Sequence, residues 1–102
     1  MSHGIIYAKL ARAQLVTLAR TLAREATPAI AARYTDAIIA KCEGLSEFPN
    51  RGTPRDDIRP GVRTMPFRRR VLIAYAVKPG TVTILGVFYG GQDFAALLRE
   101  ED

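Results

Sequence analysis

The sequence is poor in the residues that build disulfides and metal sites, and it has no long apolar run. Of its 102 residues one is a cysteine, Cys42, one is a histidine, His3, and tryptophan is absent. A single cysteine excludes an internal disulfide, and a metal site would need carboxylates for nearly all its ligands, so we expect no metal and no cofactor. Residues 1–10 lack the pattern of a signal peptide, and no stretch is long and apolar enough to span a membrane. We therefore expect a cytoplasmic protein that does not contact a membrane.

Recognisable catalytic motifs are missing as well. The sequence has no glycine-rich phosphate loop, no zinc-ligand spacing, and no serine or cysteine nucleophile with a histidine to serve it. Cys42 falls on the apolar stripe of a predicted helix, where a small core residue is expected. The length suits one domain, residues 1–102, with a single core. These absences favour a protein that works by binding.

Positive charge is concentrated in one fifth of the chain. Residues 51–70 contain seven arginines and two aspartates, whereas the rest of the chain is neutral overall. A basic stretch can be a solvated surface. Contact with an anionic partner is more typical when every cation is arginine, because the guanidinium group matches phosphate and carboxylate. We expect five of these side chains to form a basic patch that binds such an anionic target: Arg59, Arg63, Arg68, Arg69 and Arg70.

Apolar residues recur at helical spacing in the first half of the chain. They predict an amphipathic helix over residues 9–25. Thr27 and Pro28 suit the N-cap and first position of a second helix, which is expected to run to about Glu47. Because only two or three residues join them, the two helices should pack as an antiparallel hairpin. Residues 4–7 are β-branched and aromatic and predict a short strand before it.

β-Branched and aromatic residues dominate the second half. Residues 71–77 and 82–89 flank Lys78-Pro79-Gly80, in which proline fixes φ and glycine accepts a positive φ, and this predicts a β-hairpin. Residues 61–67 predict a preceding strand, and Asp93 can cap a last helical turn. The fold class is therefore α+β, with an N-terminal strand and an antiparallel helix hairpin followed by a C-terminal antiparallel sheet of about three strands.

Both faces of the predicted β-hairpin are apolar, whereas a sheet with one solvated face alternates apolar and polar residues. The helix hairpin can cover one face. The other face is covered either by the C-terminal segment or by another polypeptide, because a contiguous exposed apolar area usually marks an interface. A slip of one residue in register would exchange the two faces. For the second alternative, four residues form the expected partner site: Leu72, Ala74, Leu85 and Val87.

Four stretches have the order and spacing of a known family. They are Leu45 with Phe48-Pro49 and Gly52, then Arg59-Pro60-Gly61-Val62-Arg63, then Val71-Leu72-Ile73-Ala74-Tyr75 with Val77, and last Ile84-Leu85-Gly86-Val87-Phe88-Tyr89-Gly90-Gly91-Gln92-Asp93. Together they resemble the ParE branch of the RelE/ParE superfamily, the toxins of bacterial toxin-antitoxin operons often described as plasmid stabilisation proteins. The resemblance covers nearly the whole chain.

The resemblance implies the RelE/ParE fold, a small antiparallel sheet packed against a helix hairpin. It also implies a cognate ParD-like antitoxin, whose disordered C-terminal part folds around the toxin to give a hetero-oligomer. For the ParE branch it implies DNA gyrase as the target and inhibition without catalysis.

The RelE branch instead cleaves messenger RNA on the ribosome with basic and tyrosine side chains. In this alternative Arg63, Arg69, Tyr75 and Tyr89 would supply the catalytic groups, although packing is the simpler role of both tyrosines. RelE-like nucleases commonly carry a basic or tyrosine residue close to the C-terminus, beyond the last strand, and this chain has Phe94, Leu97, Leu98, Arg99 and acidic residues there. We therefore favour the gyrase inhibitor. A third alternative is a nucleic-acid-binding regulatory subunit without toxicity.

Overall fold

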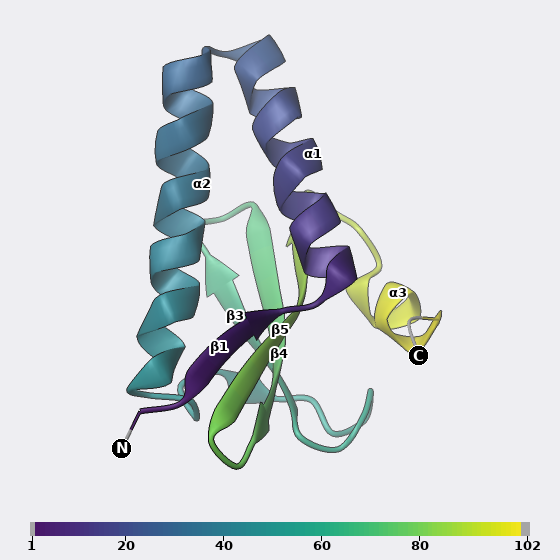
Figure 1. Ribbon diagram of the computed structural model, residues 1–102. Helices are drawn as coiled ribbons and strands as arrows, with labels where there is room; N and C mark the ends of the chain where they lie inside the picture. Colours follow the sequence, from purple (N-terminus) through teal and green to yellow (C-terminus); the bar gives the residue numbers. More distant parts are fainter. Residues whose placement is uncertain (1, 101–102) are drawn as a thin grey trace.

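The computed structural model describes residues 2–100 and shows two long helices on one face of a five-stranded sheet (Figure 1). A short 3-10 turn, Gly44–Ser46, follows the second helix, which therefore ends before the predicted Glu47. The α+β class is confirmed. In chain order the elements are β1 (Gly4–Tyr7), α1 (Lys9–Glu25), α2 (Pro28–Glu43), β2 (Thr53–Pro54), β3 (Val62–Phe67), β4 (Val71–Lys78), β5 (Thr81–Tyr89) and α3 (Phe94–Glu100).

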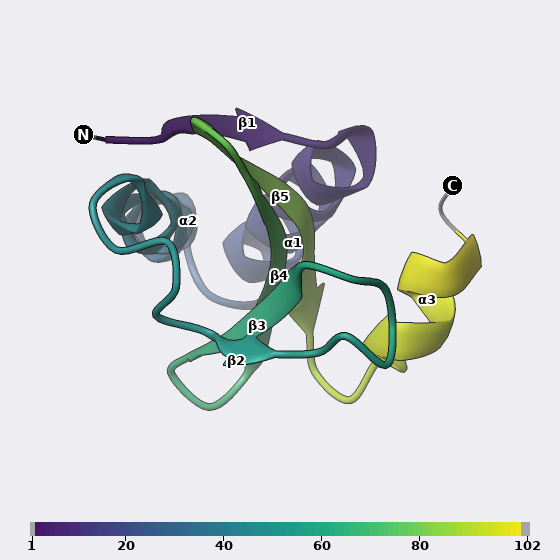
Figure 2. The ribbon, with the colours of Figure 1, turned by 90° about the horizontal axis from the view of Figure 1, so that it is seen from below.

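The sheet has the strand order β1-β5-β4-β3-β2 and is mixed. The three strands β3, β4 and β5 form the predicted antiparallel meander, and the two-residue turn at Pro79 and Gly80 joins the last two. At one edge β1 lies parallel to β5, with Ile5 opposite Val82, and at the other edge β2 pairs with β3 (Figure 2). The sequence predicted an edge or joining strand over residues 4–7, but neither its parallel pairing with β5 nor the short strand β2 was predicted, because such pairing is long-range and leaves no local pattern.

The helix hairpin forms where the sequence predicts it. The Thr27 hydroxyl accepts a hydrogen bond from the Ile30 amide at 3.1 Å, and Pro28 occupies the first turn of α2. Both helices bury one stripe against the sheet, and the hairpin extends past the sheet at the end that carries the α1–α2 connection (Figure 1). The main core joins Ala11, Leu18, Ile38, Cys42 and Leu45 to Met65, Phe67, Val71, Ile73, Tyr75, Val82, Ile84 and Val87.

A β-bulge in β5 changes which face its side chains occupy. Ala74 pairs with Gly86, but the next residue of β4, Tyr75, pairs with Ile84, so Leu85 has no partner. Because of this extra residue, Ile84 and Val87 both face the helices. At Gly86 the backbone passes so close to its surroundings that a Cβ atom would press into the ring of Phe88.

The C-terminal helix α3 covers part of the second face of the sheet, on the side opposite α2 (Figure 2). Leu98 packs with Ala74, Phe88 and Ile58, and the rings of Phe88 and Phe94 lie 6.0 Å apart. The predicted cap is present, since the Ala96 amide donates to the Asp93 carboxylate at 3.1 Å. Of the two alternatives for this face, the chain's own C-terminal segment therefore accounts for part of the cover.

We expect Gly86→Ala to lower the free energy of unfolding by about 2 kcal/mol, because overpacking at such a site costs about 1–3 kcal/mol. Gly91→Ala is the matched control: a Cβ atom there meets nothing within 4 Å, and its effect should stay within about 0.5 kcal/mol. Urea unfolding of both variants measures the difference. If both variants lose the same free energy of unfolding, the close approach of the backbone at the bulge is contradicted.

Stability should decline at alkaline pH because of Cys42. Burial raises the pKa of this thiol from 9.0 to about 12. Between these values only the unfolded chain loses the proton, so each pH unit favours unfolding by up to about 1.4 kcal/mol, whereas below pH 9 both states keep the proton and the effect disappears. We expect Cys42→Ala to be less stable at neutral pH but to decline less steeply just above pH 9. Urea unfolding at a series of pH values measures this difference. An equal decline of the free energy of unfolding in both proteins above pH 9 would contradict the prediction.

Candidate functional site

Two residues considered for catalysis hold a loop in place. Tyr75 is fully buried, and its hydroxyl accepts a hydrogen bond from the Gly52 amide at 2.8 Å. Arg63 donates to the carbonyl oxygens of Asn50, at 3.1 Å, and Gly52, at 2.7 Å. Burial raises the pKa of Tyr75, against the opposing effects of the Gly52 amide and of nearby arginines, Arg63 and Arg51. Both side chains thus tie residues 48–54 to the sheet.

The four residues of the nuclease alternative do not share one accessible site. Tyr75 lies opposite Arg63 in the β3–β4 pair, inside the structure just described. Tyr89 is on β5 and pairs with Val71, which lies four positions before Tyr75 in β4. Its side chain is partly buried against the helices. Arg69 is exposed in the turn between β3 and β4. Arg63 and Tyr75 therefore lie together in one part of the sheet, and Arg69 and Tyr89 lie near the β3–β4 turn. The Tyr75 hydroxyl is also buried.

The five arginines of the predicted basic patch occupy three separate places. Arg68, Arg69 and Arg70 form the exposed turn between β3 and β4. Arg63 is bound to the carbonyl groups of the preceding loop. Arg59 is partly buried in the loop before β3, where it lines a cavity on the second face of the sheet. Only the three turn arginines form a continuous exposed cationic surface.

Arg68 is held in a defined position within this turn. Its backbone has φ +53°, a left-handed conformation that side chains other than glycine seldom adopt. Its guanidinium carbon lies 4.8 Å from the ring centre of Phe67 and 5.2 Å from that of Tyr34, on α2. The two rings meet edge to face at 5.6 Å. Cation–π contacts of this kind fix the guanidinium group without using its N–H groups.

The predicted partner site does not lie on one face. Leu85 belongs to the cluster on the second face, and so does Ala74, which is fully buried there. Leu72 shares this face by alternation along β4 and is partly exposed. Val87 instead packs in the main core beneath the helices, so the assignment of these four residues to a single face was wrong at this position. The cause is the bulge at Leu85, which reverses the alternation of β5.

Grooves lie at the edges of the covered faces, and two of them border the second face of the sheet and α3. One, of about 290 Å³, lies on the second face and is lined by Val62, Ala76 and Leu85 together with Arg59, Lys78 and other residues. The other, of about 460 Å³, runs between α1 and α3 and is lined by Leu10, Leu18, Leu97 and other residues. No sequence pattern predicts the second groove, because α1 and α3 are far apart in the chain.

Within residues 2–99 no three histidine, cysteine, aspartate or glutamate side chains lie close enough to hold a metal ion. No helix in this part of the chain is both long and apolar enough to cross a membrane.

Comparison with known proteins identifies the family. Residues 5–94 match the family described as "ParE toxin of type II toxin-antitoxin system, parDE". A comparison with curated proteins finds no match. Among solved structures the chain resembles one titled "Chromosomal ParDE TA system from P. aeruginosa", with a TM-score of 0.76 and 22% identity over 87% of this chain and 97% of that one. This chain belongs to the ParE toxin family of type II toxin-antitoxin systems.

Proposed function

We propose that this toxin inhibits DNA gyrase in the bacterial cytoplasm without catalysing a reaction, and that a small cognate antitoxin of the ParD kind neutralises it. The family match over residues 5–94 carries the proposal. The structural relative belongs to a ParDE system, which supports an antitoxin partner for this chain too. The absence of a shared site for Arg63, Arg69, Tyr75 and Tyr89 supports a toxin that acts by binding rather than as a nuclease.

The second face of the sheet is the proposed antitoxin surface. Leu72 and Leu85 are its partly exposed members, whereas Ala74 lies beneath the cluster of α3 and is out of a partner's reach in this arrangement. The groove beside Leu85 is lined by the apolar side chains of Val62, Ala76 and Leu85, and Lys78 is an exposed cation beside them. Such a surface suits a segment that carries apolar side chains flanked by carboxylates.

The exposed turn between β3 and β4 is the proposed contact with gyrase or with the DNA that gyrase holds. Arg69 and Arg70 are exposed and, within residues 2–99, have no carboxylate partner. Guanidinium groups of this kind bind phosphate and carboxylate in a bidentate manner. Arg63 is left out of the contact, because its guanidinium group already binds two backbone carbonyl oxygens.

Charge reversal in the turn should abolish toxicity. We expect the double variant Arg69→Glu, Arg70→Glu to permit growth on induction without antitoxin, and the purified protein to leave gyrase supercoiling intact, because repulsion replaces attraction at an anionic target. The matched control is Arg20→Glu, Arg24→Glu, two exposed arginines of α1 that reverse the same charge elsewhere. Arrest and gyrase inhibition equal to the unaltered protein would remove the turn from the target contact.

The same cultures discriminate the nuclease alternative. If the arrested cells contain cleaved transcripts while purified gyrase keeps its activity, the proposed target is wrong and the protein acts as RelE-branch toxins do. Intact transcripts with lost supercoiling are the expected result.

Antitoxin binding should fail when a charge is placed on the second face. We expect Leu85→Glu to weaken the complex about tenfold or more, because the carboxylate replaces an apolar contact and repels the carboxylates of the partner segment, and about 1.4 kcal/mol suffices for that factor. Ile39→Glu, on the exposed side of α2, is the control and should bind normally. Titration calorimetry with the antitoxin measures both, after thermal unfolding has shown that each variant is folded. Unchanged affinity of Leu85→Glu would reject this surface.

A further inference from the structure

A small cavity of about 260 Å³ lies between α2 and the turn that joins β3 to β4. Ile30, Arg33 and Tyr34 line it from the first turns of α2, and Arg68 lines it from the β3–β4 turn. None of the residues that line it is acidic. More than thirty positions separate the two segments in the chain, so no local sequence pattern predicts that they meet. The cavity thus combines two cations, one aromatic ring and one aliphatic wall.

The geometry prepares Arg68 to bind a ligand. Its guanidinium group lies over the rings of Tyr34 and Phe67, while among the described residues its N–H groups have no hydrogen-bond or ion-pair partner. A guanidinium group fixed in this way loses little conformational freedom when it binds an anion. Its positive φ is a strained conformation, and strain of this kind is concentrated at functional sites.

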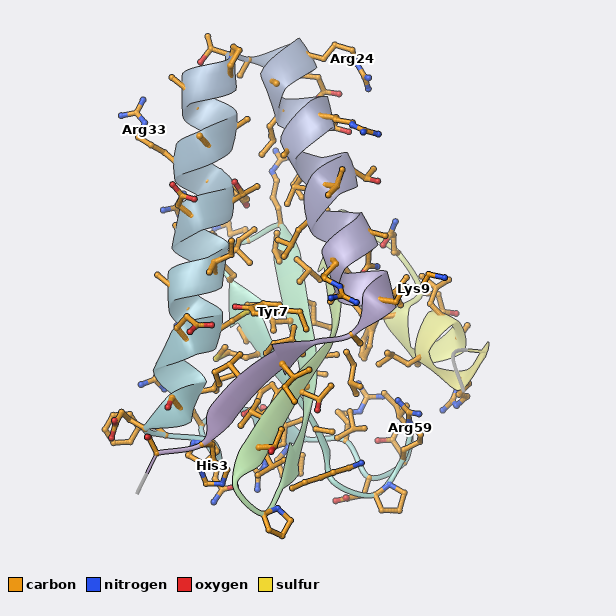
Figure 3. All side chains as sticks on the ribbon, in the orientation of Figure 1. His3, Tyr7, Lys9, Arg24, Arg33 and Arg59 are labelled. Atoms are coloured by element: carbon orange, nitrogen blue, oxygen red, sulfur yellow. The ribbon has the colours of Figure 1, made fainter. Side chains whose placement is uncertain are left out.

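The surroundings of the cavity are electropositive. Arg69 and Arg70 follow Arg68, and Arg33 projects from α2 on the side away from α1 (Figure 3). The first turn of α2 contains no acidic residue, so nothing there offsets the positive end of the helix dipole. Arginine is the only cation in the group.

Tyr34 adds a neutral hydrogen-bond donor. Burial is the largest influence on its hydroxyl and raises the pKa, with a further increase from Tyr89, whereas Arg68 and Arg70 act in the opposite direction. The net effect raises the pKa, so the hydroxyl keeps its proton at neutral pH and can donate it to an anionic oxygen. Among the described residues it has no hydrogen-bond partner.

We propose that Arg33, Tyr34 and Arg68 form a binding site for a phosphodiester group of a single-stranded nucleic acid. The two guanidinium groups and the Tyr34 hydroxyl contact the phosphate oxygens, and Ile30 with the tyrosine ring packs against the adjoining sugar or base. Arg69 and Arg70 contact neighbouring phosphates. An acidic peptide is the less suitable ligand, because the site combines planar aromatic and guanidinium surfaces with a row of cations, as nucleic-acid strands require.

This site needs neither gyrase nor antitoxin, so it is tested with the toxin alone. Fluorescence anisotropy of a short, labelled, single-stranded oligonucleotide measures binding by the full chain at several salt concentrations. Arg68→Gly removes the guanidinium group while relieving the positive φ, and Tyr34→Phe removes only the hydroxyl. The control is Arg24→Ala, an exposed arginine in the last turn of α1, which projects from the hairpin on the side opposite Arg33 (Figure 3).

We expect Arg68→Gly to weaken binding about tenfold and to reduce the logarithmic salt slope by about 0.7, the value for one phosphate contact on a single strand. Tyr34→Phe should weaken binding by about threefold to tenfold with an unchanged salt slope, because it removes a hydrogen bond and no charge. Arg24→Ala should bind almost as the unaltered protein does.

Three results would overturn the site. The first is no measurable binding of the oligonucleotide by the unaltered protein. The second is equal affinity for Arg68→Gly and Arg24→Ala in protein that unfolds at the normal temperature. The third is displacement of the oligonucleotide by an acidic peptide that binds more tightly. If the protein inhibits gyrase but does not bind the oligonucleotide, this site is rejected and the proposed function is kept. If it binds the oligonucleotide but does not inhibit gyrase, the proposed function is rejected and this site is kept.

Discussion

Burial of one face of the β4–β5 hairpin by the helices is the constraint on which the rest of the structure depends. Ile73, Val82 and Ile84 are completely buried there, opposite Leu18 and Ile38 of the two helices. A fully buried side chain of this size contributes about 1.5–3 kcal/mol, whereas a two-stranded hairpin or an isolated helix is marginal in water. Each hairpin therefore needs the other, and their contact sets the positions of the connecting loops.

This contact also decides which polar residues are free to act. It places Tyr75 inside the core, and its hydroxyl then meets the amide of Gly52, while Arg63 binds carbonyl groups of the same loop. Tyr75 and Arg63 are residue types that can act in catalysis, but here both stabilise the loop that contains Gly52. The arginines of the β3–β4 turn lie outside the core and remain available, and Arg68 is oriented there by the ring of Tyr34.

The bulge in β5 shows how one residue redistributes a surface. Without it, Leu85 and Val87 would share a face, as their spacing in the sequence predicts. With Leu85 unpaired, Val87 joins the helix-facing core and Leu85 joins the second face with Phe88. α3 covers only part of that second face, so the groove beside Leu85 stays open at its end.

The sequence by itself determined the α+β class, both long helices, the three-stranded meander and the Pro79-Gly80 turn, because periodicity, capping and turn chemistry are local properties of the chain. It also determined the excess of arginine in residues 51–70 and the family resemblance. Only the tertiary structure decided that β1 joins the sheet beside β5, that Val87 faces inward, that the arginines are divided among three places, and that Arg33 and Tyr34 meet Arg68. These features depend on contacts between residues far apart in the chain, and such contacts follow from packing rather than from any local pattern.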